Sequence, residues 1–334
     1  MPSNRKKKQH YVPQCYLEQW AIENTHQINV YDKAKKENRQ NNITDVASEN
    51  YFYDIDFNKA FSEDEKKTTN YSSEELNELS HEQFIENFFA DTIENELSMF
   101  LNFFKRKAEI FNKKKHFISN FLRKRFSKQL AYQHIRTKST RTTIDGMSDC
   151  LQQVLVAMNA SENNIKAFQT TKDSTKLIHG QMITNKAEIK KLSQTFNNYI
   201  WILAINKTNK EFYTTDKPIT IRPHVTHQFM SMSGLASKGV EVFYPISPKI
   251  MLIMFEREYH KNIRNLDRHY FVIDNVKDVD SYNALSAIFS TRFVFSKSGN
   301  FDIINELLKA DNTIFDRPNI SLSWNGQTYY PQRK

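Results

Sequence analysis

The sequence predicts an α+β fold in which a central antiparallel helical region packs on a mostly antiparallel sheet. Helical patterns gather in the middle of the chain, at 80–197, and strand patterns dominate 198–334. Shorter strand patterns fall within 8–55, so these N-terminal strands are candidates to join the C-terminal sheet. Because 334 residues are enough to bury one large core, residues 1–334 are interpreted as a single α+β domain.

The N-terminal stretch 8–20 reads KQHYVPQCYLEQW and predicts a rigid corner. Pro13 fixes its own φ and disfavours helix at the residue before it, so a short helix is predicted to begin near Pro13. His10 then lies in extended chain just outside that helix. It either fills or caps the corner or takes part in chemistry, since a lone histidine is compatible with both roles.

A small antiparallel sheet is predicted to follow the corner. The run 27–32 alternates, with Ile28 and Val30 on one face, and 43–46 and 51–54 are predicted to pair with it. The next segment, 56–79, is acidic and polar without periodicity, which predicts a mobile loop and a candidate lid.

Two long helices are predicted next, at about 80–111 and 117–137. Ser80 with Gln83 three residues later forms a capping-box pattern, and an apolar stripe follows it. The stripe consists of Ile85, Phe89, Ile93, Leu97, Leu101 and Phe104. The short connection between the helices favours antiparallel packing. Further helical patterns cover 142–160, 163–168 and 186–196, with Gly180 as a predicted break.

The C-terminal part is predicted to be mainly sheet. Strand patterns occur at 199–205, 211–215, 219–221, 240–243, 250–255, 270–273 and 292–295, helices at 281–290 and 301–309, and a terminal hairpin at 320–324 and 328–330. The longest apolar runs, 200–205 and 250–255, are far shorter than the ~20 residues that a membrane-spanning helix requires. No membrane partner is therefore expected.

Composition excludes several classes of protein. Cys15 and Cys150 show no metal-ligand spacing, and no apolar signal segment follows the basic run 5–8, so a reducing, cytoplasmic location is predicted. With 6 Gly and no glycine-rich phosphate loop, dinucleotide-binding and P-loop sites are excluded. The net charge of +9 favours nucleic acid or another polyanion as partner, although a lysine-rich solvated surface gives the same balance.

Three features are candidates for chemistry. At 100° per residue Glu86 and Glu94 fall on or beside the apolar stripe, where a carboxylate needs a metal, an arginine or a raised pKa. On the next helix Arg125, Gln129, Tyr132 and Arg136 share a face with Phe117, Phe121 and Leu122. Arginines there either neutralise the glutamates or bind phosphate. Asp216 ends a predicted strand before Pro218, as an exposed functional group or a turn-capping Asp.

The opening motif KQHYVPQCYLEQW resembles that of DUF4238, a bacterial family of unknown function. Matching segments follow in order at 28–33, 48–53, 133–137, 215–218 and 245–248. The chain departs from the family pattern at Lys138, where a Pro is usual, and at Lys217, where an Asn is usual. The resemblance implies glutamates in the first long helix and supports the placement of the fold and the site, but it implies no activity.

These residues together predict a metal-dependent phosphodiesterase or nuclease. Glu86, Glu94 and Asp216 would hold Mg²⁺ or Mn²⁺, His10 would act as general base or position water, and Arg136 would stabilise charge on the phosphate. The bacterial context suggests a role in host defence or as a toxin. The alternative is a non-catalytic module that binds nucleic acid or protein, in which the Glu/Arg pairs are structural.

Overall fold

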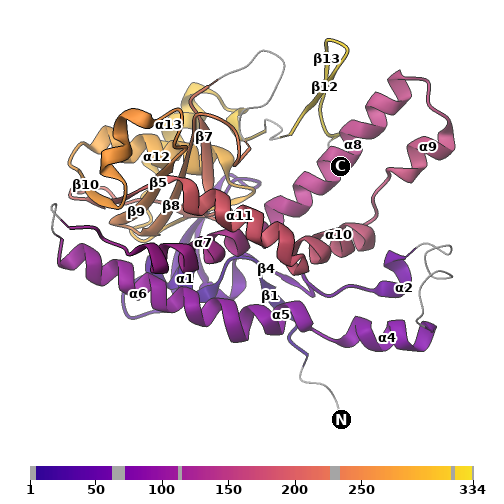
Figure 1. Cartoon of the computed structure of the whole chain (residues 1–334), viewed down its shortest axis with the longest axis horizontal. Helices are drawn as coiled ribbons and strands as arrows, with labels where there is room; N and C mark the ends of the chain where they lie inside the picture. The colour runs from indigo at the N-terminus through magenta and orange to yellow at the C-terminus, as the bar shows by residue number, and fades with distance from the viewer. Residues whose placement is uncertain (1–4, 62–71, 112–114, 226–233, 317–319, 333–334) are drawn as a thin grey trace.

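The computed structural model describes residues 5–61, 72–111, 115–225, 234–316 and 320–332. The fold is α+β, as predicted (Figure 1). Two sheets and the helices around them form the main body, and a helical segment with a terminal hairpin extends from it as an arm. None of the helices within these ranges combines the length and the apolar character needed to cross a membrane.

The larger sheet has five strands in the order β10-β5-β9-β8-β7. Their bounds are β5 Ile200–Asn206, β7 Thr220–Pro223, β8 Val240–Ser247, β9 Ile250–Phe255 and β10 His269–Ile273. All pairs are antiparallel except β10 with β5. Every residue of β5 and β8 is buried, because helices cover both faces. The family-like segment 245–248 mostly continues β8, with a bulge between Pro245 and Ser247.

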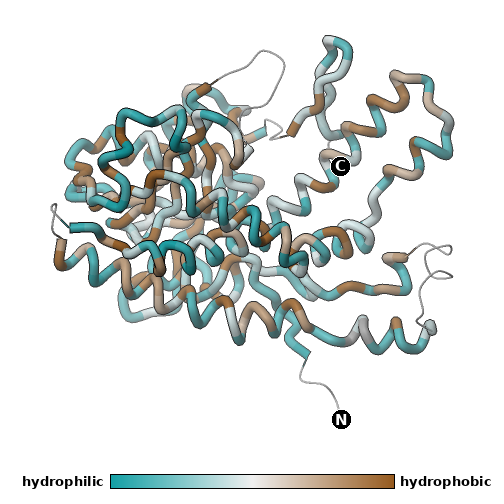
Figure 2. The backbone as a smooth tube through the Cα atoms, in the orientation of Figure 1, coloured by the Kyte–Doolittle hydropathy of each residue, from teal (hydrophilic) through white to brown (hydrophobic). Residues whose placement is uncertain are grey.

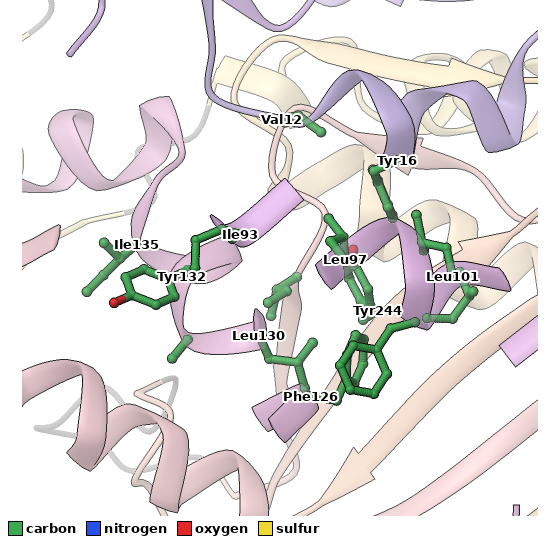
Figure 3. Packing of buried hydrophobic residues seen from close by; sticks show 14 of the residues in the cluster. Val12, Tyr16, Ile93, Leu97, Leu101, Phe126, Leu130, Tyr132, Ile135 and Tyr244 are labelled. Carbon is green, nitrogen blue, oxygen red and sulfur yellow. The ribbon is translucent and has the colours of Figure 1, made fainter. Parts of the chain in front are cut away.

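The two faces of this sheet meet different helices. One face packs on α12 (Val276–Phe289), where Val279 joins Phe243 and Met251. The other packs on α6 (Asn95–Glu109) and α7 (Asn120–Ile135). Figure 3 shows Leu97 and Leu101 of α6 pointing toward Phe126 of α7 and Tyr244 of β8.

The second sheet joins strands from both ends of the chain, in the order β3-β2-β11-β6. Its members are β2 Gln27–Asp32, β3 Glu37–Asn42, β6 Thr214–Thr215 and β11 Phe293–Ser296, all antiparallel. The helix α13 (Asp302–Ala310) packs against it through Ile304. The N-terminal strands thus pair with C-terminal ones as predicted, but in a sheet separate from the larger one.

The small strands after β2 differ from the prediction. Residues 43–46 are not a strand: η2 (Ile43–Asp45) is a 3₁₀ turn, and Asn42 caps it by accepting from the Thr44 N–H. Residues 51–54 are not a strand either, because β4 is Ser48–Asn50 and pairs with β1 (Lys8–His10). The Asn42 cap and the pairing of β4 with β1 therefore decide where these elements begin and end. Neither can be read from the alternation of apolar and polar residues.

The first long helix also begins elsewhere than predicted. Ser80 lies inside α4 (Ser73–His81), where its hydroxyl donates to the Leu76 carbonyl (2.7 Å) and accepts from the Phe57 N–H (2.9 Å). Continuous helix begins at Phe84 and comprises α5 (Phe84–Phe88), the π-helical η3 (Phe89–Glu94) and α6. The predicted capping box is therefore wrong, because Ser80 contacts α2 instead of starting a helix.

The loop predicted at 56–79 is partly helical. Its described parts contain α2 (Phe57–Ala60) and the start of α4, and the rest of the predicted lid, 62–71, lies outside the described residues. Asp56 caps α2 by accepting from the Lys59 N–H (3.2 Å). The periodicity of a single helical turn is too short to appear in a polar sequence, so α2 was not predicted.

The arm comprises α8 (Lys138–Ala157) and α9 (Glu162–Ala167). The helix α10 (Lys172–Thr184) packs on the main body, and α11 (Lys186–Asn198) leads back to the sheet. The hairpin β12 (Leu322–Trp324) and β13 (Gln327–Tyr329) packs on α8. In Figure 2 apolar and polar positions alternate along α8, as expected for a helix with one covered face.

Gly180 does not break a helix but lies inside α10. A Cβ atom at this position would come within 2.7 Å of Ile55 Cδ1 and 3.3 Å of Ile85 Cδ1. The absence of a side chain therefore lets α10 pack closely on the core, which is a packing role that the sequence pattern does not distinguish from a break.

Candidate functional site

The N-terminal corner forms as predicted. Pro13 has φ −57° and occupies the N-cap position of α1 (Gln14–Leu17), while His10 ends β1 just before it. Pro13 suits the start of a helix because its fixed φ is already near the helical value. The main chain of His10 pairs with Ser48 on β4. This corner places His10 against the end of α7.

Arg136 follows α7 and has a fully buried side chain, 1% exposed. Its Nη2 donates to Glu94 Oε1 (2.8 Å) and to the His10 carbonyl (2.7 Å), and its guanidinium lies over the Phe89 ring, 4.2 Å from the centroid. Burial opposes the charge, but the nearby Tyr53 hydroxyl and Glu94 raise the pKa of Arg136 above its ordinary value. Arg136 is therefore a permanent buried cation whose Nη1 has no partner among the described residues.

His10 presents a buried imidazole to the same site. Gln14 Nε2 lies 3.4 Å from Nδ1, so Gln14 can donate to Nδ1 and leave the ring proton on Nε2. Nε2 is buried and, within the described part of the chain, finds no partner with hydrogen-bond geometry, although the Ile43 and Thr44 carbonyls lie close enough to raise the pKa. Burial outweighs this effect and lowers the pKa of His10, so the ring is neutral at pH 7.

Glu86 of α5 and Glu94, the last residue of η3, both face this cluster. Glu94 pairs with Arg136, whereas Glu86 has a looser ion pair, 3.8 Å to Lys6 Nζ, with a side chain 12% exposed. Burial raises the pKa of Glu86, Arg136 and Lys6 oppose this, and the Glu94 charge adds to it. The predicted inward position of Glu86 is confirmed. Because π-helical turns contain an extra residue, the 100° count holds only approximately across η3.

Asp216 lies in a different setting. Its carboxylate is fully buried and accepts from the backbone N–H groups of Thr291 (2.8 Å), Arg292 (2.7 Å) and Phe293 (3.0 Å), just before β11. Asp216 is therefore a turn-capping residue, and the expectation of an exposed side chain at a strand end is wrong. Within the described ranges, no group of three or more His, Cys, Asp or Glu side chains is arranged to hold a metal.

The predicted face of α7 is only partly inward. Gln129 and Tyr132 are buried, as Arg136 is, but Arg125 forms a surface ion pair with Glu96 and Phe121 is 69% exposed. The antiparallel packing of the two long helices is confirmed, because Phe100 and Phe104 contact Phe126 while Phe88 and Phe89 contact Tyr132. Phe121 lies in the first turn of α7 and points to solvent.

The sequence reasoning missed Tyr53 and Gln9, which support the cluster. The Tyr53 hydroxyl donates to the Arg136 carbonyl (3.0 Å), and Gln9 accepts from the Tyr53 N–H (2.5 Å) while donating to Asp54 (2.5 Å). The sequence signal that could have identified Gln9 and Tyr53 is that both are polar residues within segments that resemble the family. Cys15 is near Glu94, but burial raises the pKa of its thiol to about 12, which suits packing and not nucleophilic attack at neutral pH.

A contact between the buried Glu241 and the more exposed His224 was also missed. Glu241 on β8 accepts from the Tyr282 hydroxyl (2.8 Å) and contacts His224 Nε2 (2.7 Å). The β7–β8 pairing and α12 bring these groups together, so their sequence spacing carries no signal. The local indication of a polar contact here was a glutamate within the largely apolar strand 240–247.

Comparison with known proteins identifies a family and nothing more specific. The family model described as protein of unknown function (DUF4238) matches residues 8–300. Searches of curated proteins and of solved structures gave no match. The matched region includes the corner, both long helices and both main sheets, and therefore all the residues of the candidate site.

Proposed function

The chain belongs to the DUF4238 family, and on that premise we propose that it is a phosphodiester-processing enzyme, a metal-dependent nuclease. The observation that carries this proposal is a pair of buried polar atoms, Arg136 Nη1 and His10 Nε2, to which the described residues offer no partner with hydrogen-bond geometry, in the same cluster as Glu86 and Glu94. A buried unpaired donor costs about 1–3 kcal/mol, so two of them beside two carboxylates support a polar ligand at this place.

Glu86 and Glu94 would hold Mg²⁺ or Mn²⁺. Mg²⁺ in proteins commonly takes one or two carboxylates and completes its coordination with water and substrate phosphate, which fits two glutamates. Asp216 is left out of this ligand set because three N–H groups already occupy its oxygens. The bound ion would neutralise phosphate charge and lower the pKa of a coordinated water.

Arg136 and His10 would act on the phosphate directly. The guanidinium is held by Glu94, the His10 carbonyl and the Phe89 ring, so its Nη1 is fixed in direction and can donate to a phosphate oxygen. The ring proton on His10 Nε2 makes it a donor that positions water or phosphate, which favours the positioning role over the general-base role.

The test is cleavage of labelled RNA and DNA with Mg²⁺ or Mn²⁺ by wild type, Glu86→Gln and His10→Ala. We expect Glu86→Gln to lose activity while keeping its melting temperature, because a neutral amide suits a site in which burial already raises the carboxyl pKa. His10→Ala should lose ~10²–10⁴-fold in rate with unchanged metal affinity. Asp91→Asn is the matched control, an exposed carboxylate in η3.

A binding module is the second candidate, and the Glu94–Arg136 pair favours it. A fully buried arginine 2.8 Å from a carboxylate is also what a purely structural ion pair looks like. Salt-sensitive binding of nucleic acid that stays intact would select this candidate over the enzyme. A role in bacterial defence or as a toxin belongs to the enzyme proposal and predicts that wild type, but not Glu86→Gln, slows the growth of an expressing cell.

A further inference from the structure

A second polar feature adjoins the candidate site. A cavity of about 310 Å³ lies between the N-terminal parts of α8 and α10 and the segment 49–52. The cationic side chains that line it are Lys138, Arg141, Lys172 and Lys176, and the acidic ones are Glu49 and Asp145. The cavity therefore carries an excess of positive charge, and four threonines also line it.

Both carboxylates in this wall already have partners. Glu49 forms an ion pair with Lys138, and Asp145 accepts from the hydroxyls of Thr170 (3.1 Å) and Thr175 (2.5 Å). They do not contact the remaining three cations. Those three charges are left without a carboxylate contact among the residues that the structure describes.

Arg141 and Lys176 are held in place by neutral groups. Arg141 Nε donates to His179 Nδ1 (2.9 Å), its Nη2 donates to the Phe52 carbonyl, and its guanidinium lies 3.6 Å from the centroid of the Phe52 ring. Lys176 Nζ donates to the carbonyls of Tyr51 (2.7 Å) and Asp54 (2.9 Å). The two cations are thus oriented by hydrogen bonds that do not neutralise them.

The charges in this wall repel one another. Burial lowers the pKa of Lys176, the charges of Arg141 and Lys172 lower it further, and Asp54 and Asp173 partly oppose this. Burial also lowers the pKa of Arg141, to about 10, although the charges of Glu49 and Asp145 oppose this. An anion in the cavity would oppose both effects, because it favours the charged form of every cation near it.

The start of α10 forms part of the same wall. Thr171 caps this 13-residue helix and accepts from the Ser174 N–H (3.1 Å), and Thr171 and Lys172 both line the cavity. The N–H groups of the first helical residues have no partner within a helix, and the helix dipole is positive at this end. Helix donors and fixed cations together form a surface suited to phosphate oxygens.

We propose that this cavity is a phosphate-binding subsite that takes a backbone phosphate of a nucleic-acid strand. Only the source of the phosphate rests on the proposed function. The cavity adjoins the candidate site through two neighbouring residues, since Phe52 lines it and the Tyr53 hydroxyl contacts Arg136. A phosphate at Arg136 and another in this cavity would then belong to the same strand.

The test compares Lys172→Gln with Lys186→Gln. Both lysines are exposed first residues of 13-residue helices, but only Lys172 lines the cavity. Binding of a fluorescent single-stranded oligonucleotide is measured without divalent metal, so that no cleavage intervenes, and inorganic phosphate is the competitor. Lys172→Gln should weaken binding about tenfold and reduce the salt-dependence slope by about one, whereas Lys186→Gln should match wild type.

Equal affinity for the two variants, or no competition by inorganic phosphate, would overturn the subsite. If inorganic phosphate binds wild type but not Lys172→Gln while no oligonucleotide binds, phosphate recognition is upheld and the nucleic-acid source is overturned. Cleavage by wild type with no effect of Lys172→Gln on binding would leave the nuclease proposal standing without the subsite. If Lys172→Gln alone loses binding and wild type cleaves no substrate, the subsite stands and the nuclease proposal falls.

Discussion

Arg136 and Arg141 lie on either side of the dipeptide Phe52–Tyr53 and differ in what balances their charge. Arg136 contacts the Tyr53 hydroxyl and pairs with the carboxylate of Glu94. Arg141 contacts the Phe52 ring and carbonyl, and its side-chain partner is the neutral His179. Arg136, buried in the core, therefore has a counter-charge within hydrogen-bond distance, whereas Arg141, on the wall of the cavity, is oriented by neutral groups.

The largest expected effect comes from removing the two arginines in turn. Arg136→Met should lower the free energy of unfolding by about 3 kcal/mol, near the low end for a broken buried pair because Glu94 can regain solvent. Arg141→Met should cost about 1–3 kcal/mol, since it loses hydrogen bonds to neutral groups only. Urea denaturation of both variants measures the difference, and a larger loss in Arg141→Met would refute the comparison.

Acid should destabilise the fold through His179, the histidine that accepts a hydrogen bond from Arg141. Burial lowers the pKa of His179 to about 3 and that of His134 to about 4. The unfolded chain takes up these protons below about pH 6.5 and the folded chain does not, so stability falls as pH falls through this window. At pH 5 each histidine should cost about 2 kcal/mol relative to pH 7.5.

His179→Gln isolates this contribution. Its unfolding free energy should change less between pH 7.5 and pH 5 than that of wild type, by about 2 kcal/mol. The raised pKa of Glu86 acts in the opposite direction in both proteins and cancels in the difference. Identical pH dependence of the two proteins would show that His179 does not remain neutral in the fold.

The smallest expected effect comes from a substitution at the N-terminal corner, which should affect the candidate site but not the basic cavity. Pro13→Ala should lower stability by about 0.5–1 kcal/mol, because the native φ of −57° already suits proline and alanine restores freedom to the unfolded chain. The corner holds His10 and does not line the basic cavity, so cleavage should fall while binding of inorganic phosphate stays unchanged. If neither the melting temperature nor the cleavage rate changes, the corner does not organise the site.

Elements with a long apolar pattern were predicted well, and those decided by one side chain were not. The strands at 200–206 and 250–255 and the helix at 120–135 all lie close to their predicted positions. Ser80 failed as a cap because its hydroxyl contacts Leu76 and Phe57. Asn42 turned the chain at 43–45 where alternation alone predicted a strand. Single hydrogen bonds contribute about 1 kcal/mol, enough to set a boundary but too little to leave a periodic signal.

The sequence by itself determined the α+β class, the corner at Pro13 and the inward position of Glu86, because these depend on local backbone restriction and on the burial of apolar faces. The tertiary structure alone decided which charges meet. It joined His10, Glu94 and Arg136 through the pairing of β1 with β4 and the packing of α7, while it assigned Asp216 to three backbone N–H groups. Contacts between residues far apart in the chain depend on how the elements pack. The sequence around a buried charge therefore does not identify the residue that pairs with it.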